Sequence, residues 1–128
     1  MEKYTLKRGL SFRMGEVKKT EKPWGFEELW ANTDKYSAKK ITIYPNSRMS
    51  LQFHEKKEET IYVCKGTLRI WTSDDDDLFV DLKEGSVFHV EPKSVHRFGS
   101  AGDKQIEIME VSTSELNDVV RLKDDYGR

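Results

Sequence analysis

Four residues of this 128-residue chain have side-chain types and spacings that could bind a metal ion: Gln52, His54, Glu59 and His96. Gln52 and His54 are two positions apart, so in a strand their side chains point to the same face. Glu59 follows five residues after His54 and could return beside it through a hairpin. His96 is distant in sequence, and a closed barrel would bring it to the same place.

The chemistry of this set is that of a divalent-ion site. Two imidazole nitrogens and two oxygen donors suit a borderline ion, and we expect one ion per chain: zinc first, with Fe, Mn, Co or Ni as alternatives. The spacing alone leaves a second interpretation open. A His-x-x-x-x-Glu pattern is common by chance, and Gln52 and His54 could be ordinary polar residues of a strand.

The segments that would position these residues have the pattern of short strands. From Lys22 onward, runs of β-branched and aromatic residues alternate with turn signals, and long helical periodicity is missing. This pattern predicts an all-β sandwich or barrel. The expected strands cover residues 26–30, 37–44, 49–54, 60–64, 67–72, 78–82, 86–90, 95–98 and 105–111. Residues 114–122 suit a short helix, an irregular turn or a strand.

Length and charge restrict the domain organisation and the partners. A chain of 128 residues encloses one hydrophobic core, so we predict a single domain over residues 22–128 after an N-terminal arm over residues 1–21. The 22 basic and 23 acidic residues nearly cancel, which supplies no general field for nucleic acid or a membrane surface. We therefore expect a small-molecule ligand. Without an apolar run that suits a signal peptide or a spanning helix, a cytoplasmic location is expected.

Two further expectations concern Cys64 and the oligomeric state. Cys64 is the single cysteine and ends the apolar run 61–64, so we expect a small buried thiol. We also expect a homodimer, because small antiparallel barrels protect exposed strand edges by pairing and the N-terminal arm offers a spare strand. Trp71 is a candidate for the dimer interface if it is partly exposed.

Two stretches of the chain resemble the motifs of the cupin superfamily. Residues 46–66 follow the spacing of the first motif: His54, Glu59 and Gly66 match its positions, and Gln52 stands where many cupins carry a first His. Residues 85–96 match the second motif in length and end on His96. The resemblance implies a double-stranded β-helix, or jelly-roll barrel, with a metal on these residues. Four residues depart from these motifs, at positions expected in turns more than at ligands: Asn46, Glu91, Lys93 and Ser100.

A narrower resemblance covers most of the chain. It rests on Lys-Pro-Trp-Gly at 22–25, Met-Ser-Leu-Gln-Phe-His at 49–54, His-Arg at 96–97 and Val-Val-Arg-Leu-Lys-Asp-Asp-Tyr-Gly-Arg at 119–128. These stretches are similar to the type II phosphomannose isomerase domain, usually the C-terminal part of bifunctional mannose-1-phosphate guanylyltransferases. The resemblance implies interconversion of mannose 6-phosphate and fructose 6-phosphate, or of a related phosphorylated or nucleotide-linked sugar, in polysaccharide precursor metabolism. We expect no GTP-dependent transfer, because a glycine-rich nucleotide loop is missing.

One departure from that family bears on catalysis. Where the family continues His-His-His-Arg-Ala-Glu-His-Trp, this chain continues from His54 with Glu55, Lys56 and Lys57. Lysine is a point donor and cannot reproduce the bidentate grip of arginine on phosphate. Proton transfer would need a base, for which the candidates are Glu55, Lys56, Lys57 and His89. His89 could equally be a structural residue, because it has no visible partner in the sequence.

Two arginines are the candidates for binding a phosphate. Arg97 neighbours the expected ligand His96, and Arg128 ends the family motif. The fold does not choose among activities, because one scaffold hosts many unrelated ones. Two alternatives to the isomerase therefore stay open. One is a non-catalytic metal- and sugar-binding cupin, and the other is a metal-dependent dioxygenase.

Overall fold

The protein is built of antiparallel strands. The computed structural model describes residues 2–5 and 11–128, and among these residues it contains strands, turns and loops but no helix, which confirms the all-β prediction. The strands are β1 (Glu2–Thr5), β2 (Ser11–Met14), β3 (Lys18–Lys22), β4 (Gly25–Asn32), β5 (Ser37–Ile43), β6 (Leu51–Phe53), β7 (Glu59–Lys65), β8 (Leu68–Trp71), β9 (Phe79–Leu82), β10 (Val87–Val90), β11 (Arg97–Ser100), β12 (Ile106–Ser112) and β13 (Val120–Lys123).

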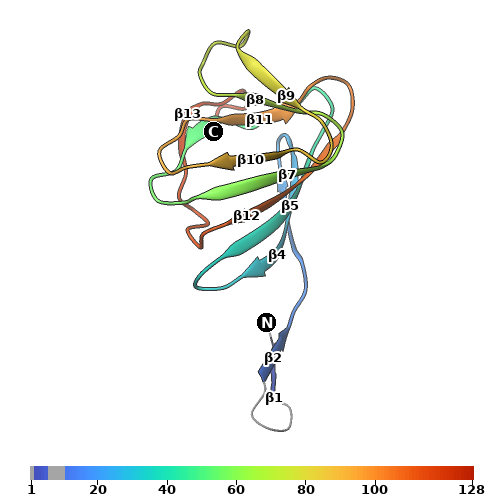
Figure 1. Ribbon diagram of the computed structural model, residues 1–128, viewed down its shortest axis with the longest axis vertical. Coiled ribbons are helices and arrows are strands. Elements are labelled where there is room, and N and C mark those ends of the chain that lie inside the picture. The colour runs from blue at the N-terminus through green and yellow to red at the C-terminus, as the bar shows by residue number, and fades with distance from the viewer. Residues whose placement is uncertain (1, 6–10) are drawn as a thin grey trace.

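Two walls of strands enclose the core (Figure 1). The first wall is a six-stranded sheet in the order β10-β7-β12-β5-β4-β3. The second wall combines the sheet β11-β8-β9 with the pair β13-β6. Backbone hydrogen bonds between Gln52 and His96, at 3.0 Å and 2.9 Å, connect these two parts of the second wall. Both of these residues belong to the predicted metal site.

The core lies between the walls and follows from the alternation of side chains along each strand. In β12 the even-numbered residues Ile106, Ile108 and Glu110 are buried, whereas Val111 is exposed on the outer face. The apolar cluster joins residues of both walls: Trp24, Ile41, Ile43, Met49, Ile61, Val63, Leu68, Ile70, Val90, Phe98, Ile106 and Ile108. One charged residue, Glu110, therefore continues the inward row of an otherwise apolar strand.

Most of the expected strands are present, with shifted ends. Each of the nine expected segments overlaps an observed strand, although the expected strand 95–98 appears as β11, two residues later. The undecided segment 114–122 consists of turns followed by the start of β13. The expected strands do not include edge strand β3, because its lysines and other polar residues carry no apolar signal.

The predicted N-terminal arm lies partly outside the described residues. Within residues 1–21, β1 pairs with β2 in a hairpin that extends away from the walls, and β3 pairs with β4 at the edge of the large sheet (Figure 1). Strand β3 crosses the expected boundary after residue 21, so part of the arm belongs to the barrel wall. The division into arm and domain otherwise stays a prediction.

Two expectations about burial are wrong. Cys64 is exposed, because β7 directs Ile61 and Val63 into the core and Tyr62 and Cys64 outward. An unbroken apolar run does not reveal which alternate residues face the core. Trp71 is buried at 7% exposure, and its Nε1 donates a hydrogen bond of 3.1 Å to the carbonyl oxygen of Asp76.

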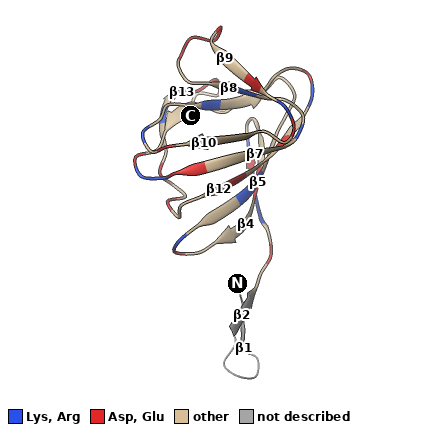
Figure 2. Cartoon of the chain, in the orientation of Figure 1, with Lys and Arg blue, Asp and Glu red and all other residues tan. Residues whose placement is uncertain are grey.

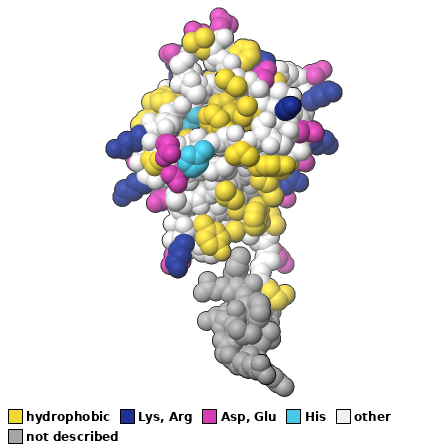
Figure 3. Space-filling model, in the orientation of Figure 1, with side chains coloured by type: hydrophobic (Ala, Val, Ile, Leu, Met, Phe, Trp, Pro, Cys, Tyr) yellow, Lys and Arg dark blue, Asp and Glu magenta, His cyan; other side chains and the backbone are white. Residues whose placement is uncertain are grey.

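The outer face of the large sheet is the most apolar exposed surface in the view of Figure 3. Tyr62, Val87 and Val111 are exposed on its neighbouring strands β7, β10 and β12. The expected homodimer stays a prediction, and this face would supply more exposed apolar area for a dimer interface than Trp71 does.

In the cartoon of Figure 2 the acidic run 74–77 occupies the loop between β8 and β9. No helix in the described part of the chain could cross a membrane.

Replacing Gly25 with alanine should destabilise the fold. Gly25 begins β4 in the Lys-Pro-Trp-Gly stretch with φ of 158°, and a Cβ atom there would overlap the carbonyl oxygen of Thr42 and lie 2.9 Å from the carbonyl carbon. Because backbone must move to relieve this overlap, Gly25→Ala should lower the free energy of unfolding by about 3 kcal/mol in a urea titration. Gly102→Ala is the control, since its Cβ would meet nothing within 4 Å. Equal stability of the two variants would contradict the steric argument.

Candidate metal centre

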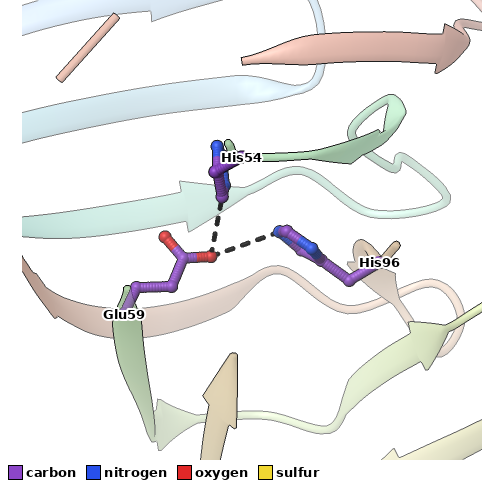
Figure 4. A group of neighbouring side chains, drawn as sticks. All are labelled: His54, Glu59 and His96. Carbon is purple, nitrogen blue, oxygen red and sulfur yellow. Dashed lines mark ion pairs between the residues drawn. The ribbon is translucent and has the colours of Figure 1, made fainter. Parts of the chain in front are cut away.

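Three of the four predicted ligands converge inside the barrel (Figure 4). His54 follows β6, Glu59 begins β7 and His96 precedes β11, so both walls contribute. The Nε2 atoms of His54 and His96 lie 3.7 Å and 3.2 Å from the same carboxylate oxygen, Oε1 of Glu59. All three side chains are buried, with exposures of 3% or less. Ligand atoms from the three residues lie within 4.8 Å of one another, which is compact enough for one ion.

The hydrogen bonds of the two histidine rings test whether a metal ion fits this cluster. Nδ1 of His54 contacts the carbonyl oxygen of Asp118, and Nδ1 of His96 lies 2.9 Å from the carbonyl oxygen of Ser94. A carbonyl oxygen only accepts, so each Nδ1 must carry the proton and a neutral ring presents a lone pair at Nε2. Both Nε2 atoms are buried without a hydrogen-bond partner. Two orphaned lone pairs beside a carboxylate oxygen suit a divalent cation, so the donor set fits the expected ion.

Gln52 lies next to the cluster. Because Gln52 and His96 are directly opposed in an antiparallel bridge, their side chains share one face of the second wall. The amide oxygen of Gln52 accepts a hydrogen bond of 2.7 Å from the hydroxyl of Ser50. One lone pair of that oxygen stays available. Its role as a fourth ligand remains a prediction.

Lys57 joins the metal centre to a second buried carboxylate. Its Nζ lies 3.0 Å from Glu59 and 3.1 Å from Glu110. Burial alone would lower the pKa of Lys57, but the two carboxylates outweigh it and raise that pKa. Burial likewise opposes ionisation of Glu59, whereas the positive charge of Lys57 favours it and acts to lower the pKa of Glu59. Burial and the charge of Glu59 raise the pKa of Glu110 to about 7.

Asp118 holds the loop between the ligands His54 and Glu59. Its carboxylate accepts backbone N–H bonds from Glu55, Lys56 and Lys57 at 3.0, 2.7 and 2.9 Å. The N–H donors of Lys56, Lys57 and Glu55 lower the pKa of Asp118. Its own carbonyl oxygen contacts the His54 ring. One residue thus fixes both the loop and the orientation of a ligand. Sequence reasoning missed Asp118, because an acidic residue in a turn carries no distinguishing signal.

A pocket of about 440 Å³ opens beside the centre. His54, Glu59 and Gln52 line it, whereas His96 does not. The apolar part of the lining combines four core residues with three partly exposed ones: Trp24, Ile41, Met49 and Phe98 from the core, and Leu29, Leu116 and Val119. Cationic side chains are frequent around the rest of it: Lys18, Lys22, Lys39, Lys57, Arg121 and Arg128. The metal centre is therefore reached through a partly apolar pocket with positive charge.

The structure places only one of the four predicted bases beside the candidate metal centre. Glu55 and Lys56 are exposed and do not line the pocket, whereas Lys57 lines it with its Nζ held by two carboxylates. His89 points to the outer face of β10, away from the core, and its Nδ1 lies 2.7 Å from the hydroxyl of Thr60. Of the four candidates, Lys57 alone contacts the metal centre.

The two arginines predicted to bind phosphate differ in their position relative to the pocket. Arg97 is 2% exposed and donates a hydrogen bond of 3.1 Å to the carbonyl oxygen of Lys123, and it does not line the pocket. Arg128 lines the pocket but grips Asp124 through Nε and Nη2, at 2.9 and 3.2 Å. Arg121, which was not predicted, lines the pocket as well. Its position in the motif at 119–128 could have pointed to it.

The fold is that of a cupin, a double-stranded β-helix, and its buried His/Glu cluster is consistent with a metal ion. Solved structures share this fold: a Klebsiella pneumoniae protein with a double-stranded β-helix domain has a TM-score of 0.70 at 13% identity, covering 82% of this chain and 84% of that one. A cupin-like protein from Thermotoga maritima has a TM-score of 0.68 at 19% identity, with coverages of 87% and 88%. These identities are low and support the fold alone.

The sequence comparison identifies the family. The model described as mannose-6-phosphate isomerase C-terminal matches residues 13–124, and the chain belongs to this family. It is 34% identical to the alginate biosynthesis protein AlgA of Pseudomonas aeruginosa over 110 residues, and 30% identical to a mannose-1-phosphate guanylyltransferase of Escherichia coli over the same length. Each match covers 84% of this chain but 22% of the relative. The chain therefore spans about a fifth of these relatives.

Metal content provides a direct test of the cluster. We expect the purified protein to retain close to one divalent ion per chain after dialysis, and His96→Ala to lose most of it because a buried nitrogen ligand is removed. Glu107→Gln is the control, since it removes the charge of a carboxylate that pairs with Lys40 outside the cluster. Elemental analysis by mass spectrometry gives the stoichiometry. Wild-type protein that holds no ion even after incubation with zinc would refute the centre.

Asp118→Ala should weaken metal binding without removing a ligand. Loss of the carboxylate frees three backbone N–H groups and loosens the loop beside His54, so we expect the zinc affinity to fall about 10–100-fold in competition with a chelator. Asp81→Ala removes a carboxylate that is paired with Arg69 on the second wall and serves as the control. Unchanged affinity in Asp118→Ala would show that the loop keeps its geometry without the carboxylate.

Proposed function

We propose that this protein is a metal-dependent isomerase of a phosphorylated sugar, of the mannose 6-phosphate/fructose 6-phosphate type. The observation that carries the proposal is the combination of a buried two-histidine, one-glutamate cluster with unpaired positive charge around the same pocket. A metal ion suits neighbouring hydroxyl and carbonyl oxygens, and the positive charge suits a phosphate. A sugar phosphate contains both groups.

The charge of the pocket differs from that of the whole chain. Six cationic and three anionic side chains line the pocket, an excess of three positive charges, whereas the chain has a net charge of -1. Lys39 pairs with Glu27 at 3.1 Å, and Lys57 and Arg128 are also paired. The other cations have no ion pair among the described residues: Lys18, Lys22 and Arg121. These three are free to attract an anionic ligand.

The position of Arg121 supports a ligand of the size of a hexose phosphate. Arg121 pairs with Gln52, which is itself opposite His96, so the three side chains form a row on one face of the second wall. Two strand spacings separate the ends of this row, or about 10 Å between the backbones of Arg121 and His96. A hexose that contacts the metal centre through its reactive end could present its phosphate to Arg121.

In this proposal each group has a defined task. His54, Glu59 and His96 hold the ion, with Gln52 as the expected fourth ligand. A bound divalent ion supplies Lewis-acid polarisation of carbonyl and hydroxyl oxygens. Arg121 binds and orients the phosphate end of the sugar. The apolar lining displaces water from the bound sugar.

A non-catalytic sugar-phosphate-binding protein is the second candidate, and the state of the bases favours it. The candidate bases Glu55 and Lys56 are exposed and lie outside the pocket lining, and His89 is on the outer face of β10. The Nζ of Lys57 already makes ion pairs with two carboxylates. A free base next to the ligand is therefore absent among the residues predicted for that role.

A coupled assay separates these two candidates. The isomerase should interconvert mannose 6-phosphate and fructose 6-phosphate when loaded with zinc, manganese or cobalt, and lose this activity after chelation, because the ion supplies the polarisation. Calorimetry on the same samples measures sugar-phosphate binding. Binding with no interconversion by any loaded form would favour the non-catalytic protein, and absence of both would reject the sugar-phosphate ligand.

Arg121→Gln should weaken binding of the phosphorylated sugar selectively. A charge-assisted contact contributes about 1.5–3 kcal/mol, so the dissociation constant of mannose 6-phosphate should rise about 10–100-fold, while the metal content stays unchanged. Arg69→Gln is the matched control, since Arg69 pairs with Asp81 away from the pocket lining. Mannose without the phosphate should bind both variants alike. Equal affinity of the two variants for mannose 6-phosphate would exclude Arg121 from the phosphate site.

A further inference from the structure

We propose a second metal site on the outer face of the barrel, formed by Glu58, His89 and Glu91, that takes a divalent transition-metal ion such as Zn²⁺. These residues are far more exposed than the buried centre: the side chains of His89, Glu58 and Glu91 are 43%, 47% and 67% exposed. The site is independent of the proposed sugar-phosphate function. It would bind an ion whether or not the pocket is catalytic.

The register of two paired strands brings the three side chains together. His89 of β10 is opposite Thr60 of β7, and Val90 is opposite Glu59. Extending this antiparallel register by one residue brings Glu91 opposite Glu58. The Nε2 atom of His89 lies 3.7 Å from Oε2 of Glu58 and 3.5 Å from Oε1 of Glu91. Ligand atoms from the three residues lie within 4.8 Å of one another.

The two carboxylates form an electrostatic conflict that a cation would relieve. Like charges directly opposite each other on neighbouring strands are destabilising. Among the described residues, no lysine or arginine lies within ion-pair distance of Glu58 or Glu91. Other glutamates of the same sheet do have such partners: Glu27 pairs with Lys39 and Glu107 with Lys40. Glu58 and Glu91 therefore lack the lysine partner that Glu27 and Glu107 have.

A hydroxyl group orients the histidine ring toward the carboxylates. Nδ1 of His89 lies 2.7 Å from Oγ1 of Thr60. With Thr60 accepting the Nδ1 proton, Nε2 presents its lone pair between the carboxylate oxygens. Metal-binding histidines commonly have such a partner on their second nitrogen, and His54 and His96 show the same arrangement in the buried centre.

The ligand set indicates the class of ion. One imidazole and two carboxylates suit a borderline ion such as Zn²⁺, Ni²⁺ or Cu²⁺, whereas Mg²⁺ and Ca²⁺ prefer oxygen ligands alone. On the face drawn in Figure 3, histidine and acidic side chains adjoin and are open to solvent, so water can occupy the remaining positions of the ion. Because the ligands are exposed and lose more side-chain freedom on binding, this site should bind less tightly than the buried centre.

Titration of the metal-loaded protein tests the second site. Protein whose buried centre is filled with zinc is dialysed and then titrated with Zn²⁺ in a calorimeter, and we expect one further binding event per chain. His89→Ala should abolish this event, and Glu91→Gln should weaken it at least about tenfold. Glu107→Gln is the matched control: it makes the same charge change on the outer face, at a carboxylate that pairs with Lys40.

Variants can remove either metal site while leaving the other intact, so the two sites can be tested independently. His96→Ala, which removes a ligand of the buried centre, should keep the weaker event, and His89→Ala should keep the tightly held ion. Absence of any further event in the wild type would overturn the second site. So would an event that persists unchanged in His89→Ala, or one that disappears in His96→Ala instead. None of these three results would affect the buried centre or the sugar-phosphate proposal.

Discussion

Burial of the Glu59 carboxylate is the constraint on which the metal centre depends. A buried charge costs several kcal/mol unless it is compensated, and this carboxylate is 2% exposed. Lys57 compensates one oxygen at 3.0 Å, while the other oxygen faces the Nε2 atoms of His54 and His96. Lys57 thus supports Glu59, and Asp118 holds the loop that carries this lysine.

Closure of the barrel connects the metal centre to the ligand pocket. The backbone bridge between Gln52 and His96 joins the two parts of the second wall and aligns their side chains on one face. The pairing of Arg121 with Gln52 extends that row by one strand. A fixed register of this kind keeps a charged group at a constant distance from the metal centre, as recognition of a two-ended ligand requires.

Local charge, rather than net charge, distinguishes the pocket and the outer face. The chain is nearly neutral, yet cations collect around the pocket and two glutamates oppose each other on the outer face. The overall composition does not report such local clusters of charge. Net charge gave no reason to expect a nucleic-acid or membrane partner, and it could not reveal the excess of positive charge around the pocket.

The sequence by itself determined the all-β class and the family, and it predicted three residues that converge inside the barrel, because strand alternation and motif spacing are local properties of the chain. It did not determine which of the neighbouring residues contact the buried cluster or line the pocket. Lys57 is buried whereas Lys56 is exposed, Cys64 faces outward, and Arg121 rather than Arg97 lines the pocket. Only the tertiary structure decided these points, since the face that a strand buries and the residues it meets depend on its partners across the sheet.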